Sequence, residues 1–360
     1  MTLSRQSKRN IKSILLFTVF ISLGAVINAL IEHGFNFYPV INEFVIGFLF
    51  GFIISISEIY IFEKRLRRLN FTFLLIIRSG FYVLIGSIII VVVAASRIGH
   101  KSDVNYYEAL NHDHFKSFLT SGAFIELLIY CVLLSIVINF IRQINRLLGQ
   151  NVLLNYFAGR YSPPIEEKLI FMFLDLKSST TIAEKIGLIK NHKFLNDFFH
   201  DMTDAILECK GRIYQYVGDE VVIVWRVKEG VKDLNCLNLF WKIKDNIESK
   251  KNKYLERYGV YPEFKAGIHI GEVIAGEIGD IKKDIVYHGD TVNTTARIQA
   301  ECNKYSSLML ASKDILSLLD FVPEYEAKSI GSIRLRGKET ELELFSVNKS
   351  VSSSKFVSND

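Results

Sequence analysis

Two aspartates in this sequence stand where they could hold divalent metal ions together. Asp175 ends the apolar run LIFMFLDL, and Asp219 follows a glycine in YVGDEVVIVW. Two carboxylates that meet without a cation repel each other, whereas two divalent ions about 3.5–4 Å apart keep both ionised and bridge a triphosphate. The alternative is that both aspartates are turn or capping residues.

Strand periodicity predicts which side chains accompany each aspartate. Side chains alternate along a strand, so Phe171 and Phe173 should share a face with Asp175. One face of the second stretch should likewise carry Ile213, Gln215, Val217 and Asp219. The two carboxylates can then meet at neighbouring strand ends.

A third stretch, VYHGDTVNTTARIQAECNK, could handle a ribose and a phosphate. It places Asn293 and Arg297 four residues apart, on one face of a helix for which Asp290 is the expected N-cap. An amide and a guanidinium on one face can bind sugar hydroxyls and phosphate oxygens. Taken alone, the same pattern also fits a polar helix surface.

The elements that must position these residues alternate between strands and helices. Strands are expected at 169–176, in a hairpin over 211–225, and as a pair around Gly271 within 263–279. Helices are expected at 179–208, 235–257 and 291–302. This order, βαββαβ with extra strands, predicts an α+β sandwich with the helices on one face of the sheet.

The composition of the whole chain excludes an ordinary soluble protein. The 360 residues are 49% hydrophobic, with a mean hydropathy of +0.23. The apolar residues crowd into positions 1–141, where four windows could each cross about 30 Å of hydrocarbon. These windows are residues 13–31, 40–62, 71–96 and 118–141. Four transmembrane helices are therefore predicted. The first is expected to be a retained anchor rather than a cleaved signal peptide. Nothing in the sequence points to nucleic-acid binding.

Basic residues predict the orientation in the membrane. Between the second and third windows lie Lys64, Arg65, Arg67 and Arg68, and after the fourth lie Arg142 and Arg146. The loop 97–117 has mixed charge and fits the outer side less cleanly. We expect a multi-pass protein of the inner or plasma membrane, with both termini and the catalytic domain in the cytoplasm. The net charge of +5 suits anionic lipid headgroups.

Three charged residues fall inside the predicted spans, namely Glu58, Arg78 and Glu126. They would be costly if they faced lipid. Either they form a buried polar network between helices or, for Arg78 in particular, the side chain reaches the membrane interface.

Five stretches in order resemble the class III nucleotidyl cyclases, which make 3′,5′-cyclic nucleotides from nucleoside triphosphates. They are FLDLKSSTTIA, YVGDEVVIVW, AGIHIGEVIAGEIG, GDTVNTTARI and LRGKETELELFSV. The resemblance implies a ferredoxin-like catalytic domain over residues 165–348. The expected organisation is then a four-helix transmembrane domain (1–141), a helical linker (142–164), the catalytic domain and a flexible tail (349–360).

The resemblance also implies roles for individual residues. It assigns two Mg²⁺ or Mn²⁺ ions to Asp175, Asp219 and the backbone carbonyl of Leu176. It assigns the ribose to Asn293, the transition-state phosphate to Arg297 and the terminal phosphates to Arg336. Such domains pair head to tail, with metal ligands from one subunit and the Asn/Arg pair from the other, so a homodimer is implied.

The purine positions depart from the family's patterns. Where adenylyl members keep lysine with aspartate or threonine, and guanylyl members glutamate with cysteine, this chain has Gln215 and Val286. A glutamine amide both donates and accepts, which matches the edge of adenine, although a rotated amide could accept from guanine. The expected activity is conversion of ATP to cyclic AMP and pyrophosphate. The alternatives are a guanylate cyclase, a diguanylate cyclase suggested by VGDEVV, and a membrane receptor whose cyclase-like domain only binds nucleotide. The upstream signal is unknown.

Overall fold

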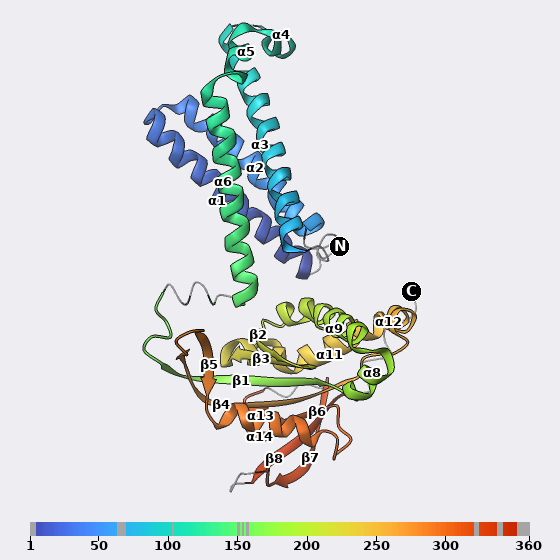
Figure 1. Cartoon of the computed structure of the whole chain (residues 1–360). Helices are drawn as coiled ribbons and strands as arrows, with labels where there is room; N and C mark the ends of the chain where they lie inside the picture. Colours follow the sequence, from blue (N-terminus) through green and yellow to red (C-terminus); the bar gives the residue numbers. More distant parts are fainter. Residues whose placement is uncertain are drawn as a thin grey trace, which may run out of the picture. The chain divides into compact units, whose positions relative to one another are not determined.

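The structure, a computed structural model, describes residues 5–62, 70–102, 104–149, 152, 155, 158–319, 324–336 and 341–350. The chain forms two compact units, Met1–Leu147 and Leu148–Asp360 (Figure 1).

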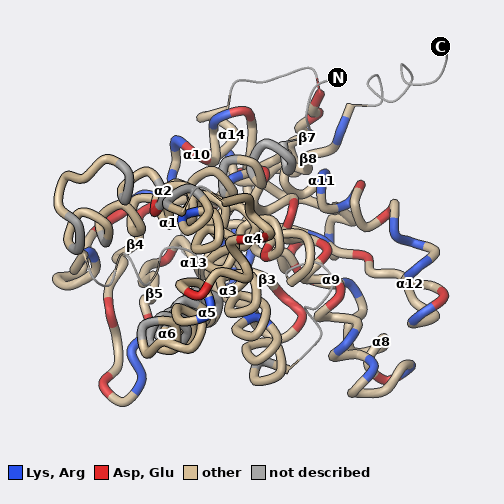
Figure 2. Tube along the Cα trace, turned by 90° about the horizontal axis from the view of Figure 1, so that it is seen from above, with Lys and Arg blue, Asp and Glu red and all other residues tan. Residues whose placement is uncertain are grey.

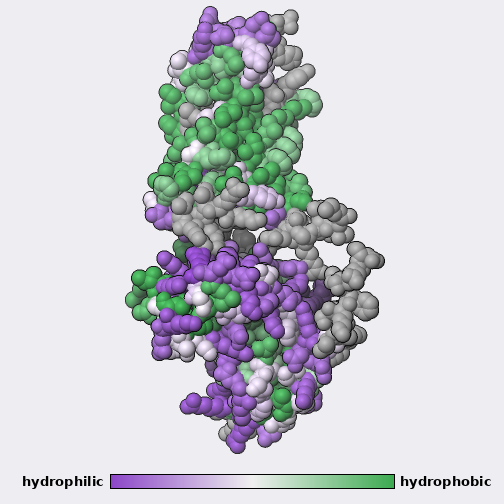
Figure 3. All heavy atoms as spheres, turned by 90° about the vertical axis from the view of Figure 1, so that its right-hand side faces the viewer, coloured by the Kyte–Doolittle hydropathy of each residue, from purple (hydrophilic) through white to green (hydrophobic). Residues whose placement is uncertain are grey.

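The first unit is helical. Its elements are α1 (Arg5–His33), α2 (Phe37–Ser57), the π-helix η1 (Glu58–Phe62), α3 (Phe71–Ser102), α4 (Tyr106–Asn111), α5 (Asp113–Leu119) and α6 (Gly122–Leu148). Its surface in Figure 3 is largely hydrophobic, with hydrophilic residues at the end formed by α4 and α5.

Three helical stretches among the described residues are long and apolar enough to cross a membrane. They are Ile14–Ile31, Glu43–Phe62 and Thr72–Gly99. The fourth predicted span falls on α6, whose 27 residues are helical, and a count of four spans stays a prediction. The basic cluster at 64–68 lies outside the described residues. The predicted helical linker is seen as far as Leu148, and much of 150–157 is also outside them.

A polar cluster is buried between α3 and η1. Arg78 is 5% exposed, and its Nε lies 3.5 Å from Oε1 of Glu58, which also accepts a hydrogen bond from the Tyr82 hydroxyl. The guanidinium carbon stands 5.2 Å from the centre of the Phe62 ring. These contacts support the buried network rather than an Arg78 that reaches the interface. The side chain of Glu126 lies outside the described residues.

The second unit is built on an eight-stranded sheet with the order β2-β3-β1-β4-β6-β8-β7, and β5 pairs with β4 beside this path. The strands are β1 (Ile165–Leu176), β2 (Arg212–Val217), β3 (Glu220–Arg226), β4 (Phe264–Ile278), β5 (Asp284–His288), β6 (Met309–Ser312), β7 (Tyr325–Ile333) and β8 (Leu342–Lys349). β4 and β6 run parallel, and the other pairs are antiparallel.

The helices of this unit are α8 (Ser179–Ile186), α9 (Leu188–Glu208), α10 (Val227–Val231), η2 (Lys232–Leu234), α11 (Asn235–Ser249), α12 (Lys251–Tyr258), α13 (Asp290–Glu301) and α14 (Lys313–Leu316). The predicted single helix at 179–208 is broken at Gly187, where φ is +80°. Charged residues of both signs mark α8 and α12 in Figure 2.

Helices cover both faces of the sheet, so the prediction of helices on one face is wrong. Alternate residues of β1, such as Ile170 and Met172, pack with α9 and α11 in the large core. The intervening Leu169, Phe171 and Phe173 form a smaller cluster on the other face, with side chains of α13 packed against it. In Figure 1, α9 and α11 lie on one side of β1 and α13 on the other.

The predicted strand pair around Gly271 is also wrong, because β4 runs unbroken from Phe264 to Ile278. Gly271 marks a close approach instead of a turn. A Cβ there would lie 2.4 Å from Oγ1 of Thr291, and one at Gly267 would lie 2.3 Å from the backbone N of Gln299. The two glycines let α13 lie directly on the sheet.

Candidate active site

Asp175 lies at the end of β1 between two charged neighbours of opposite sign. Strand pairing places Glu220 of β3 opposite it on one side and Lys265 of β4 on the other. The buried Lys265 ammonium stands 3.4 Å from Oδ2 of Asp175. The amide of Gln299, from α13, donates a hydrogen bond of 3.0 Å to the same oxygen. Two elements, β4 and α13, therefore hold this carboxylate in place.

Asp219 comes from the tight turn between β2 and β3. Val217 pairs with Glu220, which leaves a two-residue loop of Gly218 and Asp219. Gly218 has φ of +64°, as a two-residue hairpin with glycine first requires. The Asp219 carboxyl lies close enough to Asp175 for its charge to raise the pKa of Asp175. The structure thus brings the two aspartates together, as the sequence predicts.

The carboxylates of this site carry more negative charge than their surroundings offset. Burial, followed by the charge of Asp219, raises the pKa of Asp175 despite the opposing effects of Lys265 and Gln299. Burial and the charges of Asp175 and Asp219 raise the pKa of Glu220 to about 7. Divalent cations would relieve this repulsion.

The donor set fits Mg²⁺ or Mn²⁺, which prefer carboxylate and carbonyl oxygens. Among the described residues no three Asp, Glu, His or Cys side chains form a complete metal cage. Further ligands would therefore come from backbone and substrate. The side chain of Leu176 is buried in the large core, so only its backbone could take part.

Asn293 and Arg297 lie on the face of α13 that points away from the sheet. The buried face of this helix carries Thr291, Thr294, Thr295, Ile298 and Gln299. Asn293 is exposed and Arg297 is half-buried. Both lie about half a helical turn away from the buried face. One chain therefore directs Gln299, rather than Asn293 or Arg297, at Asp175.

The predicted N-cap Asp290 is instead the first residue of α13, after Gly289. Its carboxylate accepts a hydrogen bond of 3.2 Å from the Thr294 hydroxyl.

The two purine candidates lie next to a pair of tyrosines that touch. Gln215 is exposed and Val286 half-buried. Their sequence neighbours Tyr214 and Tyr287 have ring centres 4.8 Å apart. This contact brings β2 and β5 together at the two candidate positions.

One prediction for β2 is wrong. A β-bulge between Ile213 and Gln215 breaks the alternation, so Ile213 packs on the large core while Gln215 lies opposite Val222 of the smaller cluster. Arg336 is exposed on the segment after β7, and the next residues, 337–340, lie outside the described part.

Sequence reasoning missed Glu220, Lys265 and Gln299. The signal for Lys265 was a single cation inside the apolar strand FKAGIHI. Predicting Glu220 would have required the register of the hairpin, and predicting Gln299 would have required the packing of α13 on the sheet. Tertiary contacts set both of these features.

Comparisons with known proteins agree with this architecture. The family described as "Adenylate and Guanylate cyclase catalytic domain" matches residues 162–349. "Adenylate cyclase 2" of Rhizobium meliloti (strain 1021) is 34% identical over 223 residues, which cover 62% of this chain and 61% of the relative. "Adenylate cyclase" of Anabaena cylindrica is 25% identical over 186 residues, covering 50% and 36%.

Solved structures share the fold. A bacterial light-regulated adenylyl cyclase superposes with a TM-score of 0.53 at 18% identity, covering 61% of this chain and 64% of that one. In each of these comparisons, the chain spans less than two thirds of the other protein's length.

Proposed function

Because this chain belongs to the family of adenylate and guanylate cyclase catalytic domains, we propose that it converts ATP to 3′,5′-cyclic AMP and pyrophosphate at a membrane. The observation that carries the proposal is the meeting of Asp175 and Asp219 at the end of β1. Their mutual repulsion is what a metal-triphosphate complex would relieve. The apolar helices of the first unit support membrane anchoring.

In the proposed reaction the 3′ oxygen of the ribose forms a bond to the α-phosphorus while the bond to pyrophosphate breaks. Asp175, Asp219 and the Leu176 carbonyl would hold two Mg²⁺ or Mn²⁺ ions. When bound, these ions supply Lewis acidity at the phosphate and ease loss of the 3′ proton. Gln299 keeps one Asp175 oxygen oriented, and Lys265 partly offsets its charge.

Asn293 would orient the ribose, Arg297 would bind the oxygens on which charge develops, and Arg336 would bind the terminal phosphates. Asn293 and Arg297 point away from the sheet that carries Asp175, which supports a site shared between two copies. The hairpin of β4 and β5 leaves Ile274, Ile278 and Ile281 exposed, an apolar surface that a second copy could cover. We therefore propose a homodimer with two equivalent sites.

The choice of ATP rests on Gln215 and on the names of the two relatives above. Gln215 can donate to a ring nitrogen and accept from an amino group, which matches adenine. GTP is the second candidate, because Val286 offers no polar side chain that would exclude guanine.

The test is an assay of the full chain in detergent or vesicles, with ATP or GTP and either Mg²⁺ or Mn²⁺. We expect cyclic AMP from ATP, and at most weak release of cyclic GMP. The Asp175→Ala variant controls for contaminating enzymes. Nucleotide binding without any cyclic product from either substrate would favour the receptor alternative.

A further inference from the structure

The β-bulge in β2 gives this strand two consecutive side chains on the same face of the sheet. Ile213 pairs with Ile223 and Gln215 with Val222, so Tyr214 is the extra residue. Tyr214 packs against the smaller cluster, on the face to which Val222 belongs. Bulges often redirect a side chain beside a functional site. Here Tyr214 and Gln215 both face the side that carries Asp175.

Tyr214 is bound to β5 through its hydroxyl. Among the described strands β5 pairs only with β4, so the N–H groups on its other edge need partners outside the ladder. The backbone N–H of Tyr287 donates to the Tyr214 hydroxyl at 3.3 Å. The Tyr287 ring in turn packs edge-on against Phe171 at 5.6 Å. Tyr214 thereby fixes the edge of β5 against the sheet, one residue from Val286.

We propose that Tyr214 is a positioning residue that sets the purine selectivity of the site. The inference rests on the proposed cyclase function, with Gln215 and Val286 at the purine. Val286 provides no polar side chain, so discrimination depends on where the backbone of β5 stands relative to the Gln215 amide. The hydrogen bond from Tyr287 to Tyr214 fixes that relation. Without the hydroxyl, the N–H of Tyr287 loses its acceptor and β5 can shift.

The experiment compares Tyr214→Phe with the unchanged protein, using the full chain and both nucleotides. The substitution keeps the ring and removes only the acceptor. We expect the ratio of kcat/KM for ATP to that for GTP to fall by about three- to tenfold, which corresponds to the net free energy that one hydrogen bond contributes. KM for ATP should carry most of the change. The kcat should stay within about twofold, because Asp175, Asp219, Asn293 and Arg297 are untouched.

Tyr216→Phe is the matched control. It makes the same change two residues along the same strand, but the Tyr216 ring packs on Phe199 of α9, on the opposite face of the sheet. Its nucleotide ratio should not move. Gln215→Glu should raise the ratio of kcat/KM for GTP to that for ATP at least tenfold in the native protein. In the Tyr214→Phe background the increase should be smaller, because Tyr214 acts by positioning β5 relative to the Gln215 amide and the two effects are therefore not additive.

The outcomes separate this inference from the function on which it rests. If the native protein turns over neither nucleotide, the cyclase function fails and the inference fails with it. If it is active but Tyr214→Phe leaves the ratio unchanged, only the role of Tyr214 is overturned. An equal loss of activity on both nucleotides, with a lower midpoint of unfolding, would give Tyr214 a purely structural role and also overturn the proposal.

Discussion

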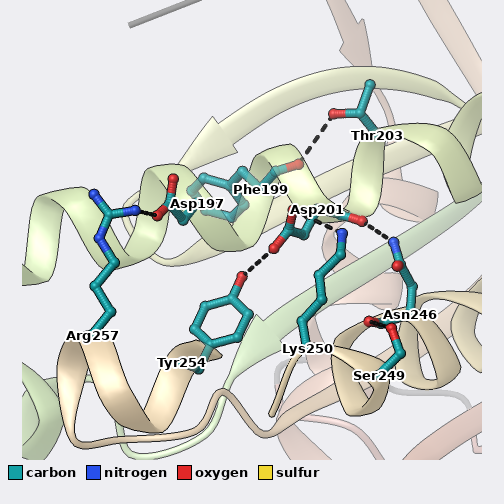
Figure 4. A network of polar contacts seen from close by, with 9 residues as sticks. All are labelled: Asp197, Phe199, Asp201, Thr203, Asn246, Ser249, Lys250, Tyr254 and Arg257. Carbon is teal, nitrogen blue, oxygen red and sulfur yellow. Dashed lines mark hydrogen bonds and ion pairs between the residues drawn. The ribbon is translucent and has the colours of Figure 1, made fainter. Parts of the chain in front are cut away.

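Two regions of the second unit hold buried or half-buried carboxylates, and the surroundings of these carboxylates are opposite. Between α9 and α12, Asp201 accepts from the Tyr254 hydroxyl at 2.9 Å and pairs with Lys250 at 2.9 Å (Figure 4). Asp197 likewise pairs with Arg257 at 2.5 Å and accepts from the hydroxyl of Tyr258 at 2.8 Å. Each aspartate in this helix clamp has a cation and a hydroxyl.

The candidate active site does not balance its carboxylates in this way. Asp175 lies beside Asp219 and Glu220 at the end of β1, and Lys265 is the one cation paired with it among the described residues. The clamp is arranged for stability, because every buried charge has a partner. The site keeps like charges together, an arrangement that favours a bound cation over the stability of the empty fold.

The largest expected effect comes from substitutions in the candidate active site. Asp175→Ala and Asp219→Ala should each reduce cyclase turnover to below about a tenth, because one carboxylate fewer leaves the triphosphate charge uncompensated. Folding should survive, since each substitution removes a repelling charge and Glu220 remains beside Lys265 to offset its charge. Tryptophan fluorescence can check this in the full chain, because both tryptophans, Trp225 and Trp241, lie in the second unit. Retained turnover with an unchanged unfolding curve would refute the metal assignment.

The clamp should respond in the opposite way. Asp201→Ala leaves the buried Tyr254 hydroxyl without its acceptor and removes the partner of Lys250. We expect the free energy of unfolding to fall by about 2–4 kcal/mol. Turnover well below the unfolding temperature should keep at least half its native value. Urea titration followed by tryptophan fluorescence measures the free energy of unfolding, and a cyclase assay measures turnover. Lost turnover at unchanged stability would mean that the clamp serves catalysis directly.

The contrast also shows which features the sequence could predict. Asp175 and Asp219 were predictable because each follows an apolar run that ends in a turn or helix start. It was not predictable that β4 forms one continuous strand, because a glycine inside a strand suggests a local break. The reason for Gly271 is Thr291, twenty residues later in the sequence. The order of strands and helices suggested helices on one face only, because that order does not show that α13 packs on the opposite face, where its threonines are buried.

Mixing variants tests whether the site is completed by a second copy. Asp175→Ala and Arg297→Ala chains should each be inactive alone. If the metal pair of one chain works with the Asn/Arg pair of another, a mixed dimer regains one intact site. With random exchange at equal amounts, about a quarter of native activity should return. The control mixes Asp175→Ala with Asp219→Ala, which damage the same half and should restore nothing. No recovery after demonstrated subunit exchange would place the whole site in one chain.

The smallest expected effect concerns the dependence of stability on pH when metal is removed with EDTA. The pKa of Glu220 is raised from 4.5 to about 7 in the folded protein, chiefly by burial and then by Asp175 and Asp219. Between these two values the folded state binds more protons than the unfolded state. The free energy of unfolding should therefore fall as pH rises from about 4.5 to 7, and the loss should be complete above that range. Partial exposure of the side chain will weaken the effect.

Glu220→Gln should flatten this decline and make the metal-free protein more stable at pH 8. Glu166→Gln, an exposed glutamate on β1, is the control and should leave the pH profile unchanged. Urea midpoints from tryptophan fluorescence, taken across the pH range, provide the measurement. A native profile that rises between pH 4.5 and 7 in EDTA would show that the charges at Glu220 are compensated, and the contrast between site and clamp would fail.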